Sequence, residues 1–196
     1  MRSINLGLKR TGDILGSGLG IIVLSPLFFV VSLLIKIFMP GPVLFRQQRI
    51  GKNGKEFYIL KFRSMKVDKQ AETAHDFTKD AERLTRLGKV IRRTKIDELP
   101  QLINVFRGDM SLVGPRPTVK EQTDQYNEFQ RQRLKMRPGM TGLAQVNGNI
   151  SLTWNERIEY DVDYATNFSV LLDLKILFRT IAVVICGEDK FKNPKG

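Results

Sequence analysis

The sequence predicts an α+β protein, in which an N-terminal membrane helix-break-helix precedes a mostly helical domain with a small β-hairpin. Three features indicate this class: an uncharged apolar run, two short apolar runs around Gly-Lys-Asn-Gly, and several stretches with helical periodicity. Strand and helix patterns do not alternate, which argues against a doubly wound sheet. A chain of 196 residues, 42% of them hydrophobic, is long enough to bury a core. We place the boundary between residues 1–39 and 40–196.

The N-terminal segment is apolar over membrane length. Residues 14–35 contain no charged side chain, and as a helix they would extend about 33 Å, enough to cross the hydrocarbon layer. A cleaved signal peptide fits poorly, because the run is long and no small-x-small cleavage site follows it. A buried helix of a soluble protein also fits poorly, since no face of the run is polar.

Basic residues flank this segment on both sides. Lys9 and Arg10 precede it, and Lys36, Arg46 and Arg49 follow. Positive charge marks cytoplasmic flanks, so a re-entrant hairpin keeps both ends inside, whereas a straight span puts one basic end outside. Ser25-Pro26 supplies a break, because Pro26 removes a backbone donor and clashes with the carbonyl of Ile22. The Ser25 hydroxyl could bond a freed backbone group. Kinked spanning helices also contain proline, so the residues alone leave both topologies open.

A β-hairpin is expected after the Pro/Gly boundary at residues 39–45. The Gly-Lys-Asn-Gly turn joins its two strands, and Phe57, Ile59 and Phe62 should point inward. If the second strand continues through Leu-Lys-Phe-Arg, Lys61 and Arg63 project to one face. The later sequence reads as helix, break and helix around residues 86–111, a loop-rich stretch at 137–149, and two helices near the C-terminal end.

Charge and rare residues narrow the chemistry. The formal net charge of +12 predicts an anionic partner such as nucleic acid, anionic lipid or a phosphorylated substrate. A single cysteine, Cys186, excludes a disulfide within the chain and favours a reducing compartment. A single histidine, His75, excludes a multi-histidine metal site. Chemistry would therefore rest on carboxylates, lysines, arginines or a hard metal ion.

The adjacent carboxylates Asp97 and Glu98 have two interpretations. With Asp97 as N-cap, Pro100 would fall in the first helical turn, where its missing donor costs little. The helix start would keep Asp97 ionised and could attract a phosphate. Asp is also a favoured N-cap and Glu a favoured first-turn residue, so a purely structural role explains the pair equally well.

Several cations surround this pair in the sequence, and each could hold phosphate oxygens or form a solvated or lipid-facing basic surface. Arg116 is held stiffly between Pro115 and Pro117. The candidate cations are Lys61, Arg63, Arg92, Arg116 and Arg137.

The loop-rich stretch supplies polar groups. Gln145 and Asn147 could grip a sugar or a base. Glu159, Asp161 and Asp163 could hold Mg²⁺ through oxygen ligands or form a solvated helix face.

Taken together, these motifs resemble the bacterial sugar transferase family of small monotopic phosphoglycosyl transferases. The resemblance covers nearly the whole chain. It runs from Lys-Arg-x-x-Asp and the Ser-Pro-broken helix, through the Asp-Glu pair and Pro-Arg-Pro, to Arg-Pro-Gly-Met-Thr-Gly. A family loop that commonly ends Asn-Gly-Arg here reads Asn147-Gly148-Asn149, so the phosphate contact of that arginine is not carried over.

The resemblance implies a membrane enzyme on the cytoplasmic face of the bacterial inner membrane. It would move a sugar phosphate from a UDP-sugar to a polyprenyl phosphate such as undecaprenyl phosphate, releasing UMP. Asp97 would be the covalent nucleophile and a Mg²⁺ ligand, and Glu98 its partner. No nucleic-acid partner is expected, and monomer and homodimer stay open. The rival hypotheses are a nucleotide-sugar hydrolase and a non-catalytic protein that binds anionic lipid.

Overall fold

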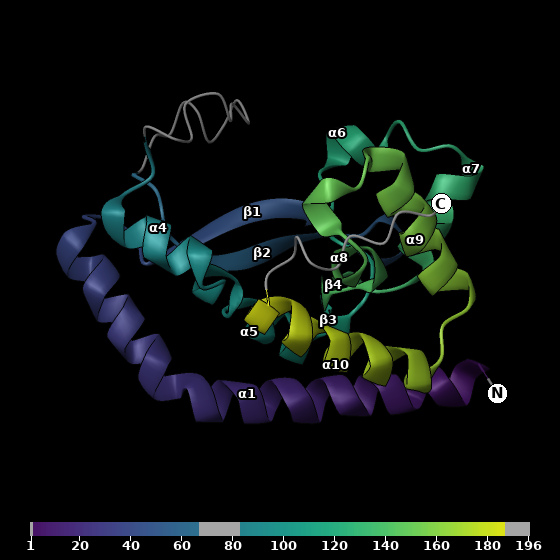
Figure 1. Ribbon diagram of the computed structural model, residues 1–196, viewed down its shortest axis with the longest axis horizontal. Helices are drawn as coiled ribbons and strands as arrows, with labels where there is room; N and C mark the ends of the chain where they lie inside the picture. The colour runs from purple at the N-terminus through teal and green to yellow at the C-terminus, as the bar shows by residue number, and fades with distance from the viewer. Residues whose placement is uncertain (1, 67–82, 187–196) are drawn as a thin grey trace.

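The computed structural model describes residues 2–66 and 83–186, and these form an α+β fold dominated by helices. A long helix, α1 (Arg2–Phe38), runs along one side of the molecule (Figure 1). The ribbon of α1 bends part-way, between its purple first half and its blue second half. Of the described helices, α1 is the one long and apolar enough to cross a membrane.

The predicted hairpin is confirmed. Strands β1 (Leu44–Ile50) and β2 (Glu56–Phe62) pair antiparallel around a short 3₁₀ turn, η1 (Lys52–Gly54). Asn53 and Gly54 adopt left-handed backbone with φ of 57° and 79°, which the Asn-Gly sequence tolerates. Phe57, Ile59 and Phe62 are all buried, as predicted, although Phe62 lies on the opposite face of β2 from Phe57 and Ile59 and packs in a separate cluster.

The region around the carboxylate pair is helix, break and helix, as predicted. Helix α4 (Arg86–Arg93) leads to the 3₁₀ turn η2 (Ile96–Glu98) and then to α5 (Gln101–Arg107). The expected N-cap role of Asp97 is wrong, because Asp97 lies inside η2 and Pro100 occupies the N-cap position of α5.

A second, parallel two-stranded sheet was not foreseen from the sequence. It consists of β3 (Ser111–Val113) and β4 (Gly139–Thr141), with Val113 opposite Thr141. The stretch expected to be loop-rich therefore contains β4 and the short helix α8 (Leu143–Val146). Between the strands lie α6 (Lys120–Thr123), α7 (Glu128–Arg131) and η3 (Gln132–Lys135).

The two predicted C-terminal helices are confirmed as α9 (Trp154–Thr166) and α10 (Val170–Cys186), after the turn η4 (Asn149–Ser151). A capping box formed by Thr153 and Glu156 starts α9. Helix α10 packs Ile176 and Val183 into a core with Val113 and Tyr164, and it contacts α1 (Figure 1). A row of its apolar side chains stays exposed: Leu171, Leu174, Phe178, Ile181, Val184 and Ile185.

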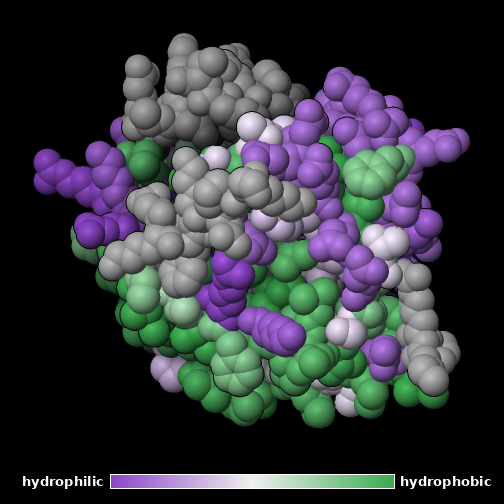
Figure 2. Space-filling model, turned by 45° about the vertical axis from the view of Figure 1, so that its right-hand side comes forward, coloured by the Kyte–Doolittle hydropathy of each residue, from purple (hydrophilic) through white to green (hydrophobic). Residues whose placement is uncertain are grey.

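Exposed apolar side chains also follow α1, including Leu19, Ile22, Val23, Phe29 and Leu33. Figure 2 shows hydrophobic side chains gathered along the lower side of the view and hydrophilic ones over the upper part. The lower side is the one along which α1 and α10 run in Figure 1. A monomeric soluble protein rarely exposes so large a continuous apolar surface.

The bend in α1 has a local cause. Pro26 lies inside the helix and has no N–H to donate to the carbonyl of Ile22. The hydroxyl of Ser25 donates to that carbonyl instead, at 2.8 Å. The expectation that Ser25 would bond a freed backbone group is thus confirmed. Helix α1 nevertheless continues past Pro26 as one helix and is not divided into two. Which side of a membrane each end of α1 faces stays a prediction.

Candidate active site

The turn η2 projects both carboxylates from one short segment. Lys95, just before it, adopts left-handed backbone with φ of 58°, an uncommon conformation for a residue with a side chain. This reversal turns the chain from the end of α4 into η2. The two neighbouring side chains then enter different surroundings, which gives Asp97 and Glu98 different chemistry.

Asp97 is buried, with 8% of its surface exposed. Within the described part of the chain, its Oδ1 atom has no hydrogen-bond partner. Burial raises the pKa of this carboxyl, and Glu98 adds to the rise, while the charges of Lys61 and Arg92 oppose it. A desolvated carboxylate oxygen beside two cations is suited to bind a metal ion or to attack an electrophile.

Glu98 is held by two cations. Its Oε1 accepts a hydrogen bond from Lys61 Nζ at 2.7 Å and lies 3.7 Å from Arg116 Nη2. Burial works to raise the pKa of Glu98, but Lys61 and Arg116 outweigh it, so the pKa lies below the usual value. Glu98 is therefore ionised at neutral pH and orients the two cations.

Three predicted cations meet around the pair. Lys61 reaches it from the end of β2, and Arg116 from the Pro-Arg-Pro segment. Arg92, in the last turn of α4, donates from Nε to Ser64 Oγ at 3.0 Å and lowers the pKa of Asp97 by its charge. The site is thus a buried carboxylate, Asp97, and a half-buried one, Glu98, beside a group of cations.

Two glycines allow the Pro-Arg-Pro segment to lie where it does. A Cβ on Gly139 would stand 2.1 Å from the backbone nitrogen of Gly114, and a Cβ on Gly114 would stand 2.3 Å from the carbonyl oxygen of Arg137. Side chains at these positions would separate β3 from β4. The glycines of the Gly-Pro-Arg-Pro and Arg-Pro-Gly motifs therefore position Arg116.

Other predicted site residues lie elsewhere. Arg63 is buried and donates to the carbonyls of Met39 and Pro40, where α1 ends. Arg137 donates from Nε to the carbonyl of Gly108 at 2.9 Å, just beyond α5. Both arginines bond carbonyls at helix C-terminal ends, a common role for cations, and in this structure neither is placed with the carboxylate pair.

The two predicted loop amides, Asn147 and Gln145, lie in different surroundings. Asn147 is buried and donates to the carbonyl of Leu143 at 2.8 Å, which closes the end of α8. Gln145 donates to the carbonyl of Met140 at 3.0 Å and lines two cavities. Arg116 and Asn149 line the same two cavities, so these three residues form a shared wall beside the carboxylate pair.

The first of these is the basic cavity, with a volume of 180 Å³. Burial and the charge of Arg116 lower the pKa of Arg49 to about 10, as expected where cations crowd together. Sequence reasoning missed Arg49, Trp154 and Arg157 as candidate site residues. No local motif marks them, since they come from β1 and α9. The cavity is lined by Arg49, Arg116, Pro117, Arg133, Trp154 and Arg157, together with polar neighbours. Pro115 lines a much smaller hollow beside Arg116 and Arg133.

The second is the apolar cavity, with a volume of 310 Å³. Lys95, Glu98 and Arg116 border it toward the carboxylate pair. The remaining wall is mainly apolar and comes from Leu112, Met140, Val146, Leu177, Val183 and Val184.

The acidic cluster of α9 does not hold a metal in the way considered from the sequence. Asp161 is fully buried and forms an ion pair with Arg133. Asp163 accepts a hydrogen bond from Asn167 near the surface. Arg133 also donates to the backbone carbonyl of Arg116 at 2.7 Å, so the buried pair supports the Pro-Arg-Pro segment. Among residues 2–66 and 83–186, no group of three or more His, Cys, Asp or Glu side chains converges on a metal position.

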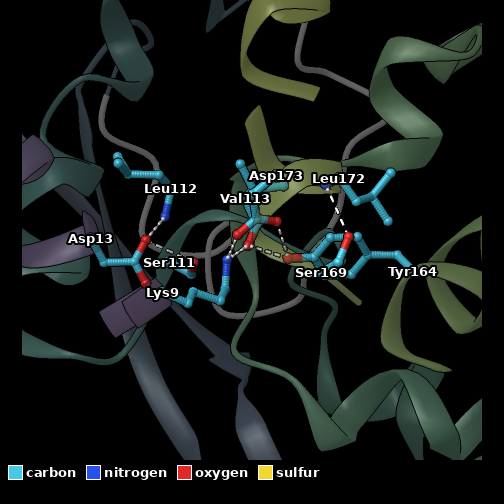
Figure 3. Close-up of polar contacts among 9 residues, drawn as sticks. All are labelled: Lys9, Asp13, Ser111, Leu112, Val113, Tyr164, Ser169, Leu172 and Asp173. Carbon is cyan, nitrogen blue, oxygen red and sulfur yellow. Dashed lines mark hydrogen bonds and ion pairs between the residues drawn. The ribbon is translucent and has the colours of Figure 1, made fainter. Parts of the chain in front are cut away.

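Polar side chains fasten the first half of α1 to this framework (Figure 3). Lys9 Nζ donates to the carbonyl of Val113 at 2.8 Å and to Asp173 Oδ2 at 2.6 Å. Asp13 accepts from Ser111 Oγ and from the backbone N–H of Leu112, both at 2.9 Å. These bonds join α1 to β3, and through Asp173 to α10.

Comparison with known proteins identifies the family. The profile of the bacterial sugar transferases matches residues 4–187. The chain belongs to the bacterial sugar transferase family. Its Lys-Arg-x-x-Asp, Asp-Glu and Pro-Arg-Pro motifs occupy the positions described above, and the resemblance drawn from the sequence is confirmed.

Three similar bacterial sugar transferases illustrate the family. The UDP-N-acetylgalactosamine-undecaprenyl-phosphate N-acetylgalactosaminephosphotransferase of Aeromonas hydrophila is 43% identical over 187 residues, covering 92% of this chain and 44% of that protein. The UDP-glucose:undecaprenyl-phosphate glucose-1-phosphate transferase of Escherichia coli K12 is 40% identical over 189 residues, covering 92% and 41%. The exopolysaccharide production protein ExoY of Sinorhizobium fredii is 38% identical over 199 residues, covering 93% and 88%. The chain therefore spans about two fifths of the first two relatives and most of the third.

Proposed function

We propose that this protein transfers a sugar 1-phosphate from a UDP-sugar to a membrane polyprenyl phosphate such as undecaprenyl phosphate and releases UMP. The reaction would be the first membrane step in building a glycoconjugate or polysaccharide. One observation carries the proposal: a buried carboxylate, Asp97, lies beside Lys61 and Arg92, and within the described residues its Oδ1 atom has no hydrogen-bond partner. The family and the activities for which two relatives are named support the same reaction.

In the first step, Asp97 attacks the β-phosphorus of the UDP-sugar. A bond forms between a carboxylate oxygen and phosphorus, and the bond from phosphorus to the bridging oxygen breaks, so UMP departs with that oxygen. Burial raises the pKa of Asp97, and the charges of Lys61 and Arg92 oppose that rise and so favour the ionised carboxylate. Arg116 and Lys61, oriented by Glu98, face the developing negative charge.

In the second step, an oxygen of the lipid phosphate attacks the same phosphorus and displaces Asp97. The products are the polyprenyl diphosphate sugar and a free carboxylate. A phosphate monoester, with a second pKa of about 6, is largely dianionic at neutral pH and needs no base to remove a proton. Glu98, whose pKa is lowered, is accordingly a better charge anchor than proton acceptor.

A divalent metal fits this donor set. Mg²⁺ often binds through one or two carboxylates and completes its shell with water and substrate phosphates. Asp97 Oδ1, buried and with no hydrogen-bond partner in the described chain, is the ligand that this structure offers, with Glu98 adjacent. When bound, Mg²⁺ would neutralise the diphosphate and favour departure of UMP.

The nucleoside end of the substrate fits the basic cavity. Arg49, Arg116 and Arg157 line it, and guanidinium groups suit phosphate oxygens. Trp154, which is 39% exposed, supplies an aromatic face at the same cavity. A base can stack on such a face without sequence-specific hydrogen bonds.

For membrane placement, we propose that the bent helix α1 enters the bilayer from the cytoplasmic side and returns to it, with the catalytic domain in the cytoplasm. Helix α1 would extend about 55 Å if straight, well beyond one hydrocarbon core. Apart from Ser25, its exposed residues around the bend are apolar, and both flanks are basic. A monotopic arrangement satisfies the length, the bend and the charge together.

The decisive experiment separates the two half-reactions. The purified protein is mixed with single UDP-sugars from a panel, without polyprenyl phosphate, and sampled by rapid quench and intact-protein mass spectrometry. We expect stoichiometric UMP release and an added sugar phosphate that maps to Asp97. Asp97→Asn retains size but loses the nucleophile, so it should form no adduct and transfer at least roughly 10³-fold more slowly. A ternary-complex rate law without any adduct would overturn the covalent route. Continuous release of free sugar phosphate without lipid would instead indicate a nucleotide-sugar hydrolase.

A further inference from the structure

The apolar cavity has a polar end and a hydrophobic end. Lys95, Glu98 and Arg116 border the end beside the carboxylate pair. Leu177, Val183 and Val184 of α10 border the other, facing Leu112, Met140 and Val146. A ligand that filled the cavity would place charge next to Arg116 and hydrocarbon against α10.

The hydrophobic end continues into an exposed apolar surface. Val184 lines the cavity and is itself 63% exposed, so it lies where the cavity meets the outer face of α10. On that outer face Leu174, Phe178 and Ile181 are also exposed. A long hydrocarbon chain could therefore pass from the cavity to the apolar surface without crossing polar side chains.

We infer that the apolar cavity binds the first isoprene units of the polyprenyl phosphate acceptor, with its phosphate beside Arg116 and the rest of its chain along α10. This inference rests on the proposed transfer to a lipid phosphate and specifies where the lipid lies. A volume of 310 Å³ is near the lower end of the range for drug-sized ligands, about 300–1,000 Å³, so it admits the start of the chain and not its whole length.

The shared wall brings both cavities to one cation, Arg116, which lies beside the carboxylate pair. Arg116, Gln145 and Asn149 line both cavities, so the two cavities adjoin along these residues, and Arg116 lies 3.7 Å from Glu98. The basic cavity suits the nucleoside diphosphate, and the apolar cavity suits the isoprenoid. Departure of UMP would leave Arg116 available to the phosphate of the lipid.

A substitution at the mouth of the cavity tests the inference. Val184→Trp fills the opening with a larger apolar group, while Ile185→Trp adds the same group at the neighbouring position, 78% exposed and outside the lining. Val184→Trp should raise the KM for the polyprenyl phosphate about ten- to hundredfold, the scale of altered apolar pocket contacts. The Ile185→Trp variant should match the native protein. Both should release UMP from the UDP-sugar in the absence of lipid at the native rate.

Direct labelling gives a second measurement that does not depend on turnover. An isoprenyl phosphate carrying a diazirine on its first units should label peptides of α10 or β4 after irradiation, and Val184→Trp should reduce that labelling. Equal KM values for the two variants, or labelling confined to α1, would overturn the cavity assignment. Loss of UMP release in the native protein would instead refute the proposed transfer, and the labelling result would still report where the lipid binds.

Discussion

Lys61 Nζ lies 2.7 Å from Glu98 Oε1, and the charge of the same lysine opposes the rise in pKa that burial causes at Asp97. Lys61 therefore acts on both carboxylates, in one case through a hydrogen bond and in the other through space. Removing the charge of Lys61 should therefore shift the pH dependence of activity in a defined direction.

We expect Lys61→Met to shift the acid limb of the activity profile to higher pH. Without this cation, burial of Asp97 is less opposed, its pKa rises further, and the ionised nucleophile is lost at a higher pH on acidification. The measurement is kcat/KM for the UDP-sugar across pH. Lys61→Arg retains the charge and should keep the acid limb near its native position. An acid limb that does not move in Lys61→Met would show that Asp97 ionisation does not control it.

Removal of divalent metal should abolish transfer. Asp97 Oδ1 is an oxygen donor, and the sequence has one histidine, so Mg²⁺ or Mn²⁺ should restore activity after EDTA. Manganese binding can be followed independently by electron paramagnetic resonance, and Asp97→Asn should weaken it. Full activity in metal-free buffer would contradict this prediction.

The bend at Ser25-Pro26 predicts a topology. In a Cys186→Ser background, cysteines introduced as Asn5→Cys and Lys55→Cys should both resist a membrane-impermeant thiol reagent in intact cells. Pro26→Ala returns a donor to the carbonyl of Ile22 and should straighten α1, so labelling at position 5 should increase. A membrane-permeant reagent should label both positions in every variant. Strong labelling of position 5 without the Pro26 change would establish a straight span.

The buried pair of Arg133 and Asp161 should support stability more than any exposed pair. Removing one partner leaves the other charge buried, so Arg133→Met should lower the free energy of unfolding by about 3–5 kcal/mol. Burial raises the pKa of Asp161 to about 6 even with Arg133 present. In Arg133→Met, ionised Asp161 would have no partner as the pH rises. The decrease in the free energy of unfolding should therefore be larger above about pH 6 than below it.

Two further variants complete this test. The double change Arg133→Met with Asp161→Leu should cost less than the sum of the single changes, because no buried charge is left unpaired. Asp124→Asn breaks the exposed pair with Lys120, whose atoms lie 2.7 Å apart, and should leave unfolding nearly unchanged. Denaturant unfolding in detergent measures all of them, and additive losses from Arg133 and Asp161 would contradict the coupling.

Local signals in the sequence were enough for the hairpin, the helices and the carboxylate pair. The Gly-Lys-Asn-Gly turn and the alternation of Phe57 and Ile59 are short-range features. Pro26 is also a local signal, but it lies within the single helix α1, and the predicted re-entrant break stays a prediction. The structure brings Lys61, Arg92 and Arg116 to the pair, and their role in substrate binding stays a prediction.

The remaining features depend on contacts between residues that are far apart in the sequence. The parallel β3–β4 contact involves strands of three residues, too short for an alternation pattern to mark. Arg63 and Arg137 have the same chemistry as Arg116, and what distinguishes them is which helix end lies within reach after folding. Asp161 looks like a surface residue in the sequence until Arg133, 28 positions away, packs against it.

The ion pair between Lys9 and Asp173 also has a consequence for the order in which the helices pack during synthesis. A separation of 164 residues means that the ribosome makes Asp173 roughly ten to thirty seconds after Lys9. Until then the ammonium group of Lys9 lacks its buried carboxylate, and a buried charge without a partner is strongly unfavourable. We therefore expect Lys9 and the neighbouring polar side chains of α1 to stay hydrated until Asp173 has been synthesised. Among the described helices, α10 therefore completes a packing surface for α1 that the earlier segments lack.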